Sequence, residues 1–232
     1  SQYAKVNGDF LVKKPKSLSL KESMVMGTAG FTALQCSFTT KTTREELLLG
    51  EKVQNVVVSG ASGGVGSMAV MILNKLGCDV TAVTGKDSNR DYLESIGAKN
   101  VVNTSEFMKD ARPLDKGLWD GAVDTVGGKV LENILSQTKD AGIVAACGNA
   151  ADIKLNTTVM PFIIRGVKLW GINSVNASIK RRQFLWNEAG KLLDFETLGK
   201  SVKEINLEEV IDIYPKMLKG ETSGRYIINL DK

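Results

Sequence analysis

From residue 55 onward, short runs of apolar and β-branched residues alternate with longer stretches in which apolar residues recur at helical spacing. Continuous apolar runs are typical of strands in a parallel sheet, because helices cover both faces of such a sheet. The runs predict six strands, at residues 56–59, 79–84, 100–103, 121–126, 142–147 and 167–172. Six strands with crossover helices predict an α/β fold, a Rossmann-type doubly wound parallel sheet over residues 36–174.

The stretches between these strands predict three crossover helices, at residues 65–76, 90–96 and 129–138. In the first of them the apolar residues fall on one face, and Gly77 follows its end, where a left-handed cap costs glycine little. Ser88 and Gly97 predict the start and the end of the second helix in the same way.

The two ends of the chain have a different pattern. Residues 1–35 predict a short strand-like start, a turn at residues 13–15 and a helix over residues 23–37. Residues 178–232 predict two helices and a final strand at residues 225–230. Neither end has the elements of a complete domain.

The composition is that of a globular protein and excludes several kinds of partner. Hydrophobic residues make up 43% and charged residues 24% of the 232 positions. The 30 Lys and Arg against 26 Asp and Glu leave a net charge of only +4, dispersed along the chain, so we expect no nucleic-acid partner. No apolar stretch approaches the roughly 18 to 20 residues of a membrane span, so we expect no membrane partner. A start at Ser1 without methionine or a signal-peptide pattern is typical of a processed or truncated chain.

The chain contains no histidine. This excludes Ser-His and Cys-His nucleophile pairs and the usual catalytic zinc ligands, so we expect no metal site. Cys36, Cys78 and Cys147 are too far apart for paired metal ligands and too few for a disulfide framework. We therefore expect a reducing, cytoplasmic location and three buried thiols that behave as small apolar side chains.

A glycine-rich turn, residues 59–66, joins the first strand to the first crossover helix. Its register is Ala61-x-Gly63-x-x-Gly66, in which alanine replaces the first glycine of the dinucleotide motif G-x-G-x-x-G. The amides and the partial positive charge at the start of the following helix favour a phosphate there. The strand before the turn and the helix after it favour a pyrophosphate site, and the alternative is a tight turn that binds nothing.

The end of the second strand carries Thr84 rather than the carboxylate that usually binds the ribose of NAD. Lys86 and Arg90 follow it, and both cations are suited to the 2′-phosphate of NADP(H). The residues therefore favour NADPH over NADH. Two alternatives stay open. The Asp87 carboxylate accepts a hydrogen bond from a ribose hydroxyl, or Lys86 and Arg90 belong to a solvated loop.

Strands five and six are expected to end on the nicotinamide side, because ligands bind at the carboxyl ends of parallel strands. Asn149 and Ser174 follow these strands, and each is equally suited to bonding its own loop. Arg165, Arg181 and Arg182 are suited to an anionic substrate such as a coenzyme A thioester. A solvated helix face is the stronger interpretation of Arg181 and Arg182.

Several segments together resemble the zinc-free medium-chain dehydrogenase/reductases, and within them the branch of NADPH-dependent acrylyl-CoA reductases and quinone oxidoreductases. The resemblance covers nearly the whole chain in order, and it rests on residues 27–33, 60–66, 82–86, 124–128 and 171–175. It implies that NADPH is bound by the following residues: Thr28, Ser62, Gly63, Gly64, Val65, Gly66, Thr84, Gly85, Lys86, Asn149, Ile163 and Ser174.

The resemblance also implies a missing segment. Members of this family begin with a GroES-like substrate domain, of which about ninety residues are absent here, a figure that follows from ordinary domain size. We therefore expect residues 1–35 to be a remnant of that domain with a linking helix, residues 36–174 to be the dinucleotide-binding domain, and residues 175–232 to return to the substrate domain.

The function that the resemblance implies is reduction of an α,β-unsaturated acyl-CoA such as acrylyl-CoA by hydride transfer from NADPH, in a homodimer. A quinone oxidoreductase is the alternative within the same class. A module that binds NADPH without turnover is the alternative for a chain with an incomplete substrate domain. No residue is predicted as the proton donor, because none of the four tyrosines is placed beside the nicotinamide by the sequence.

Overall fold

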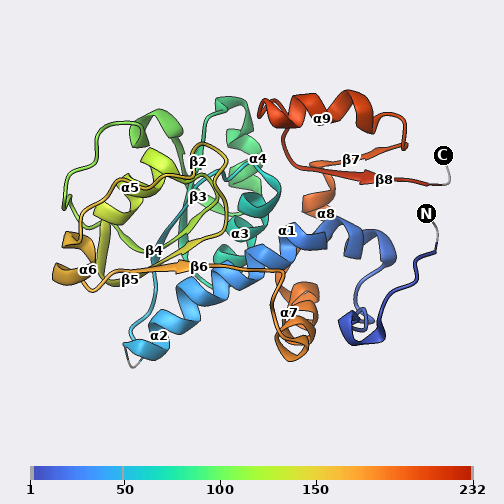
Figure 1. Ribbon diagram of the computed structural model, residues 1–232, viewed down its shortest axis with the longest axis horizontal. Coiled ribbons are helices and arrows are strands. Elements are labelled where there is room, and N and C mark those ends of the chain that lie inside the picture. The colour runs from blue at the N-terminus through green and yellow to red at the C-terminus, as the bar shows by residue number, and fades with distance from the viewer. Residues whose placement is uncertain (1–2, 49, 231–232) are drawn as a thin grey trace.

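A six-stranded parallel sheet forms the centre of the molecule, in a computed structural model that describes residues 3–48 and 50–230 (Figure 1). Its strand order is β3-β2-β1-β4-β5-β6. The strands are β1 (Asn55–Val58), β2 (Asp79–Thr84), β3 (Ala98–Asn103), β4 (Trp119–Asp124), β5 (Thr138–Ala146) and β6 (Lys168–Gly171). This order reverses between β1 and β4, as in doubly wound Rossmann folds, and confirms the predicted fold class.

Helices cover both faces of this sheet, which is why the middle residues of its central strands β1 and β4 are buried and apolar. Val56 and Val58 of β1 belong to one core cluster, whereas Val57 between them belongs to the other. The first cluster includes residues of α1 (Leu20–Phe38), α3 (Gly64–Lys75) and α7 (Ile179–Leu192), and the second includes residues of α5 (Gly128–Ser136). Successive side chains of a strand point to opposite faces of the sheet, so β1 contributes residues to two separate cores.

The remaining short elements connect or extend the main ones. They are η1 (Gly8–Phe10), η2 (Thr39–Thr43), α2 (Arg44–Leu47), η3 (Asp87–Asn89), α4 (Arg90–Ser95), η4 (Thr104–Phe107) and α6 (Met160–Ile164). Predicted strands and crossover helices agree with the observed ones to within a few residues, and β2 has the predicted bounds.

Helix α1 links the N-terminal segment to the sheet and is kinked. Ser19 caps its start and forms a capping box with Glu22. Gly27 interrupts the helical geometry with φ 45° and ψ −150°, a conformation that favours glycine because it has no Cβ. The kink turns residues 27–29 toward the glycine-rich turn, where the Cβ of Ala29 lies 3.5 Å from the position that a Cβ on Gly64 would take.

The C-terminal segment contains more structure than the sequence predicts. It holds α7, α8 (Phe195–Gly199), β7 (Val202–Ile205), α9 (Val210–Leu218) and β8 (Arg225–Ile228), and β7 pairs with β8 in a separate two-stranded parallel sheet. The two predicted helices and the predicted final strand are present, as α7, α9 and β8, but the prediction missed α8 and β7. The missed elements are short, with five residues in α8 and four in β7. Segments of this length do not show a clear periodic pattern of apolar residues.

The strand expected near the start of the chain was also wrong, because residues 3–19 contain only η1 as regular structure. An isolated extended segment is not stable without a neighbouring strand. Each helix within the described residues is too short or too polar to span a bilayer.

Candidate dinucleotide site

The glycine-rich turn packs β1 tightly against α3. Gly60 has φ 58°, and its carbonyl oxygen accepts a hydrogen bond from the Gly63 amide at 2.9 Å. A Cβ on Gly66 would lie 2.3 Å from the Gly60 oxygen and 2.7 Å from Cα of Ala61, which is closer than real Cβ contacts. Glycine is therefore required at position 66 for the helix to start this close to the strand.

The start of α3 presents backbone donors at this turn. Its N-cap is Gly63, and no side chain caps the helix. The first amides of a helix have no partner within the helix, and here they are those of Gly64, Val65 and Gly66. Ser62, Gly63, Gly64 and Val65 are all half-buried, so this end of the helix is accessible from one side. Such a start is suited to a phosphate.

A second polar corner lies where β2 ends. The Thr84 side chain is buried, and its Oγ1 lies 3.1 Å from Oγ of Ser62 and accepts a hydrogen bond from the Lys86 amide at 3.2 Å. Gly85 is exposed, and a Cβ there would meet only Oγ1 of Thr104, at 3.8 Å. The structure thus brings Ser62, Thr84, Gly85 and Lys86 together beside the turn, as the sequence predicts.

The two cations predicted for a 2′-phosphate are placed differently. The Lys86 ammonium stays at the corner, where it donates to the Thr222 carbonyl at 2.8 Å. The Arg90 guanidinium donates to the Val101 carbonyl at 3.1 Å and lies 3.6 Å from the Glu94 carboxylate, so it is turned toward β3 and its own helix. The site predicted at the corner therefore retains Lys86, and the structure does not bring Arg90 to it.

Asp87 is likewise engaged within its loop. Its Oδ1 accepts a hydrogen bond from Nδ2 of Asn103 at 3.0 Å. The carboxylate is thereby joined to the end of β3. This position gives no support to the alternative in which Asp87 holds a ribose hydroxyl.

Arg225, which sequence reasoning did not assign to the site, lies against the glycine-rich turn. Positions for a Cβ on Gly27 and on Gly64 lie 3.1 Å from Nη2 and 3.2 Å from Nη1 of its guanidinium. Nε donates to the Val25 carbonyl at 3.1 Å, and burial lowers the pKa of this arginine. The only sequence signal was one basic residue after Gly224 at the start of the last strand, and it does not reveal the contact because α3 is far away in sequence.

Two positive features therefore face the same space. The start of α3 carries the positive end of the helix dipole, and the Arg225 guanidinium lies beside it. Like charges in partly buried surroundings repel one another, and an anion between them removes the repulsion. This arrangement is suited to the pyrophosphate of a dinucleotide.

A buried carboxylate fixes the loop beneath the turn. Oδ1 of Asp124 accepts from Oγ of Ser59 at 2.6 Å, and Oδ2 accepts from the Gly127 amide at 2.9 Å. Burial raises the pKa of Asp124, although these donors oppose the change. The interaction ties the end of β1 to the end of β4, and so positions the strands on either side of the reversal in strand order.

The carboxyl ends of β5 and β6 meet beside this point. The Ile172 amide donates to the Ala146 carbonyl at 2.9 Å. Asn149 is exposed and Ser174 is half-buried, so both lie on loops that follow this edge. Thr28 is exposed immediately after the kink in α1. Of these three predicted residues, Asn149 follows β5, Ser174 follows β6, and Thr28 lies within α1 just after its kink.

Two thiols lie together near the same edge. The hydrogen bond between Cys36 of α1 and Cys147 raises the pKa of Cys36, which burial raises further, and lowers the pKa of Cys147. Cys147 is only partly buried, so the expectation of three buried thiols was wrong for this residue. Cys78 is buried, and burial raises its pKa to about 11.

Several predicted residues lie elsewhere. Ile163 is exposed on α6, which precedes β6, so it lies at the amino end of that strand rather than at the carboxyl edge. Arg165, next to α6, donates to the carbonyls of Ser136 and Thr138 and is a structural residue. Arg182 donates to loop carbonyls at Val175 and Ala177.

The residues present fit a dinucleotide better than a metal ion. The start of α3 carries no side-chain cap, and the Arg225 guanidinium lies beside Gly64 in its first turn. In contrast, the described residues include no group of three His, Cys, Asp or Glu that could hold a metal, and the whole chain has no histidine.

Comparison with known proteins places this site in a family. Residues 64–189 match the family model described as zinc-binding dehydrogenase. The Escherichia coli protein AcuI, whose name describes an acrylyl-CoA reductase, is 42% identical over 231 residues, which cover 100% of this chain and 70% of AcuI. A crystal structure of the YhdH oxidoreductase of Salmonella enterica in complex with NADP has a TM-score of 0.91 and 42% identity, over 98% of this chain and 68% of that one.

A third relative differs in name and in bound cofactor. The Bacillus subtilis protein YhfP, whose name contains the words quinone oxidoreductase, is 41% identical over 232 residues, which cover 99% of this chain and 69% of YhfP. Its crystal structure, with NAD bound, has a TM-score of 0.89 and covers 98% of this chain.

The fold and the turn define the dinucleotide-binding part of a Rossmann-type oxidoreductase. The chain belongs to the zinc-binding dehydrogenase family, within the medium-chain dehydrogenase/reductase superfamily. The family description names zinc, but the described residues of this chain do not offer a ligand set for it.

Proposed function

We propose that this chain is the NADPH-binding part of an oxidoreductase that reduces the activated double bond of an α,β-unsaturated acyl thioester such as acrylyl-CoA. The observation that carries the proposal is the pairing of a phosphate-binding turn with a cationic corner. Thr84, Gly85 and Lys86 replace the usual acidic residue beside the turn. The relative bound to NADP and the acrylyl-CoA reductase name of AcuI support this assignment.

Each group in the site has a defined task in this proposal. The amides of Gly64, Val65 and Gly66 and the Arg225 guanidinium bind the pyrophosphate, while the Gly63 amide holds the turn through the Gly60 carbonyl. The Thr84 hydroxyl and the Lys86 ammonium bind the 2′-phosphate, with Ser62 fixing the Thr84 side chain through the 3.1 Å contact. Asn149, Ser174 and Thr28 lie along the path toward the nicotinamide. Arg90 and Ile163 have no place in this assignment, because the structure directs them elsewhere.

NADPH, when bound, supplies the hydride that adds to the β-carbon of the alkene. The residues of this chain bind the cofactor and orient it, and most of the rate enhancement that they supply comes from fixing the distance and angle between the reacting atoms. The α-carbon also needs a proton. No residue of this chain is assigned as its donor.

Relative affinity for the two cofactors tests the cofactor assignment. Isothermal titration of this chain with NADPH and with NADH is expected to give tighter binding of NADPH. Tighter binding of NADH, the reduced form of the NAD bound in the YhfP structure, would overturn the cofactor assignment. Steady-state NADPH oxidation by the full-length protein, called the parent protein below, then tests the substrate, with acrylyl-CoA expected to be turned over faster than a small quinone.

A quinone oxidoreductase is the second candidate, and the name of YhfP favours it. The same cofactor site serves both reactions, so only the substrate assay separates them. If this chain binds NADPH without oxidation by either acceptor, while the parent protein oxidises it, the chain alone is a binding module. We assign residues 1–35 and 175–232 to the flanks of a GroES-like substrate domain and residues 36–174 to the cofactor domain.

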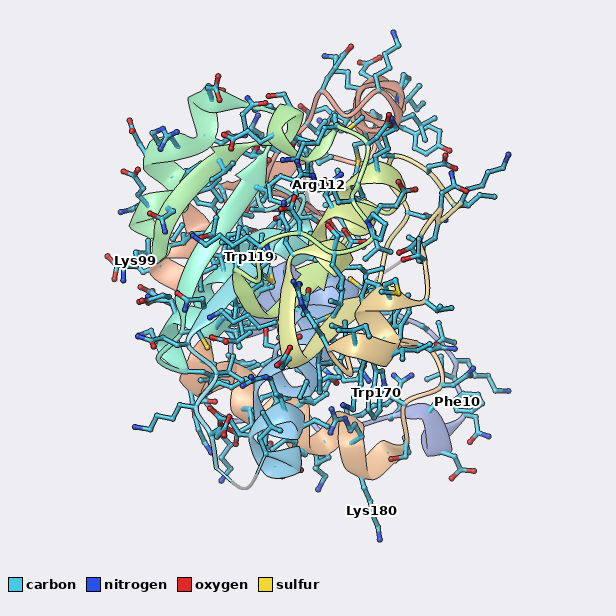
Figure 2. The ribbon with its side chains drawn as sticks, turned by 90° about the vertical axis from the view of Figure 1, so that its left-hand side faces the viewer. Phe10, Lys99, Arg112, Trp119, Trp170 and Lys180 are labelled. Atoms are coloured by element: carbon cyan, nitrogen blue, oxygen red, sulfur yellow. The ribbon has the colours of Figure 1, made fainter. Side chains whose placement is uncertain are left out.

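We further propose a homodimer and a cytoplasmic location. β6 is an edge strand of the six-stranded sheet, and its Trp170 remains 46% exposed. In Figure 2, Trp170 and Lys99 lie toward opposite sides of the molecule, as expected for β6 and β3 at the two edges. Exposed apolar side chains such as Trp170 favour association at an edge, whereas lysines such as Lys168 on β6 and Lys99 on β3 disfavour it. The location rests on the three free cysteines.

A further inference from the structure

A chain of hydrogen bonds joins α4 to the start of β8. Ser201, between α8 and β7, lies at its centre. Its carbonyl oxygen accepts a hydrogen bond from the Arg225 amide at 3.1 Å, and its Oγ lies 2.9 Å from the Tyr92 hydroxyl. Tyr92 belongs to α4, which follows the loop that carries Lys86. The chain thus connects a helix beside the 2′-phosphate corner with the arginine beside the pyrophosphate turn.

The direction of the Tyr92 hydrogen bond follows from the second partner of Ser201. Oγ of Ser201 donates to the Leu198 carbonyl at 2.9 Å, and a serine hydroxyl has only one hydrogen to donate. Tyr92 is therefore the donor and Ser201 the acceptor. Both side chains are partly buried, so a replacement that removes the Tyr92 hydroxyl leaves a hydrogen-bond acceptor with little access to water.

The contact between Ser201 and the start of β8 leaves little freedom. Gly224 has φ 70°, and a Cβ there would lie 2.1 Å from the Ser201 carbonyl oxygen. The Gly224 amide donates to the Ser62 carbonyl at 3.2 Å, so this backbone contacts the glycine-rich turn directly. A shift of Ser201 would therefore displace the backbone from which the Arg225 side chain extends.

We propose that Tyr92 is a positioning residue for dinucleotide binding. Its hydroxyl fixes Ser201, Ser201 fixes the start of β8, and the start of β8 places the Arg225 guanidinium between Gly27 and Gly64. The inference rests on the proposed function, because the position of Arg225 affects binding only if the pyrophosphate of a dinucleotide lies at the turn. It assigns to α4 an effect on the pyrophosphate, which NADPH and NADH share, whereas Lys86 acts on the 2′-phosphate alone.

The test compares binding of NADPH and NADH to the parent protein and its variants. Tyr92→Phe keeps the ring and removes the donor, and it is expected to weaken both nucleotides by the same factor, about three- to tenfold, as for loss of one partly buried hydrogen bond. Ser201→Ala is expected to weaken the binding of both nucleotides at least as much as Tyr92→Phe does. Ser201→Thr retains a hydroxyl and is expected to bind both nucleotides about as tightly as the wild type. Lys86→Ala is the matched control, and it is expected to weaken NADPH alone.

A double-mutant cycle separates positioning from a general loss of stability. In an Arg225→Gln background, Tyr92→Phe is expected to have no further effect on affinity, because the residue that it positions is gone. A Tyr92→Phe effect that is additive with Arg225→Gln, or confined to NADPH, would overturn the proposal. So would unchanged affinity in Tyr92→Phe. Melting temperatures of all variants show whether folding is affected, and a structural role alone would not give the same non-additivity.

The cycle also distinguishes this inference from the function on which it rests. If the wild-type protein binds neither nucleotide, the proposed function fails and the positioning role fails with it. If the wild-type protein binds NADPH tightly and Tyr92→Phe binds it equally well, only the positioning role fails.

Discussion

The two ends of the candidate site are built in different ways. At the phosphate end, a Cβ on Gly66 would lie 2.3 Å from the Gly60 oxygen, so helix and turn are closely packed, and Thr84, Lys86 and Arg225 each have a polar partner. At the nicotinamide end, Thr28 and Asn149 are exposed. From this difference we expect the phosphate end to contribute most of the affinity for the cofactor in the proposed assignment.

The largest expected effect comes from disturbing the close packing of helix and strand at the phosphate end. Gly66→Ala places a Cβ 2.3 Å from the Gly60 oxygen, so α3 has to move away from β1. Strain of this kind costs about 1–3 kcal/mol, and we expect NADPH affinity to fall up to about 100-fold. Isothermal titration measures the affinity and thermal unfolding the stability.

The matched control is Gly199→Ala, because a Cβ there meets no atom within 4 Å. It is expected to change neither the affinity nor the melting temperature. If Gly66→Ala bound NADPH as tightly as the wild type, the close packing of helix and strand would have no part in cofactor binding.

Lys86→Ala tests the corner of the phosphate end next to the turn. Loss of one ammonium with charge-assisted hydrogen bonds is expected to weaken NADPH about tenfold and to leave NADH unchanged. Arg90→Ala is the control cation, because the structure directs its guanidinium toward Val101 and Glu94. An equal loss in both variants would mean that Arg90 rotates to the 2′-phosphate on binding.

What the sequence could predict follows the same division. The strands and the turn were predictable, because each depends on residues that are close in sequence, such as Gly63 and Gly66. Arg225 was not, because its place beside Gly64 depends on how β8 packs after a long return of the chain. Arg90 and Ile163 show the opposite case: both lie at suitable positions in the sequence, but in the structure tertiary contacts and strand direction place them away from the turn.

The thiols near the nicotinamide end provide a prediction with a pH dependence. Only the thiolate is alkylated, and the Cys147 pKa lies below the usual thiol value while that of Cys78 lies at about 11. As the pH rises, iodoacetamide is therefore expected to label Cys147 first, and to label Cys36 and Cys78 only later, because the pKa of each of these two thiols is raised. Peptide mapping by mass spectrometry measures the order, and equal rates at all three positions would contradict it.

Asn149→Ala is expected to have the smallest effect. Asn149 is exposed, and an exposed hydrogen bond to the cofactor contributes little because water replaces it, so NADPH affinity should fall no more than about twofold. The same variant in the parent protein is expected to lower the rate of hydride transfer more than the affinity, because orientation at the reacting carbon affects the rate directly. Single-turnover NADPH oxidation by stopped flow separates the two quantities. A loss of affinity as large as that of Lys86→Ala would show that the nicotinamide end also contributes to binding, and the contrast between the two ends would no longer hold.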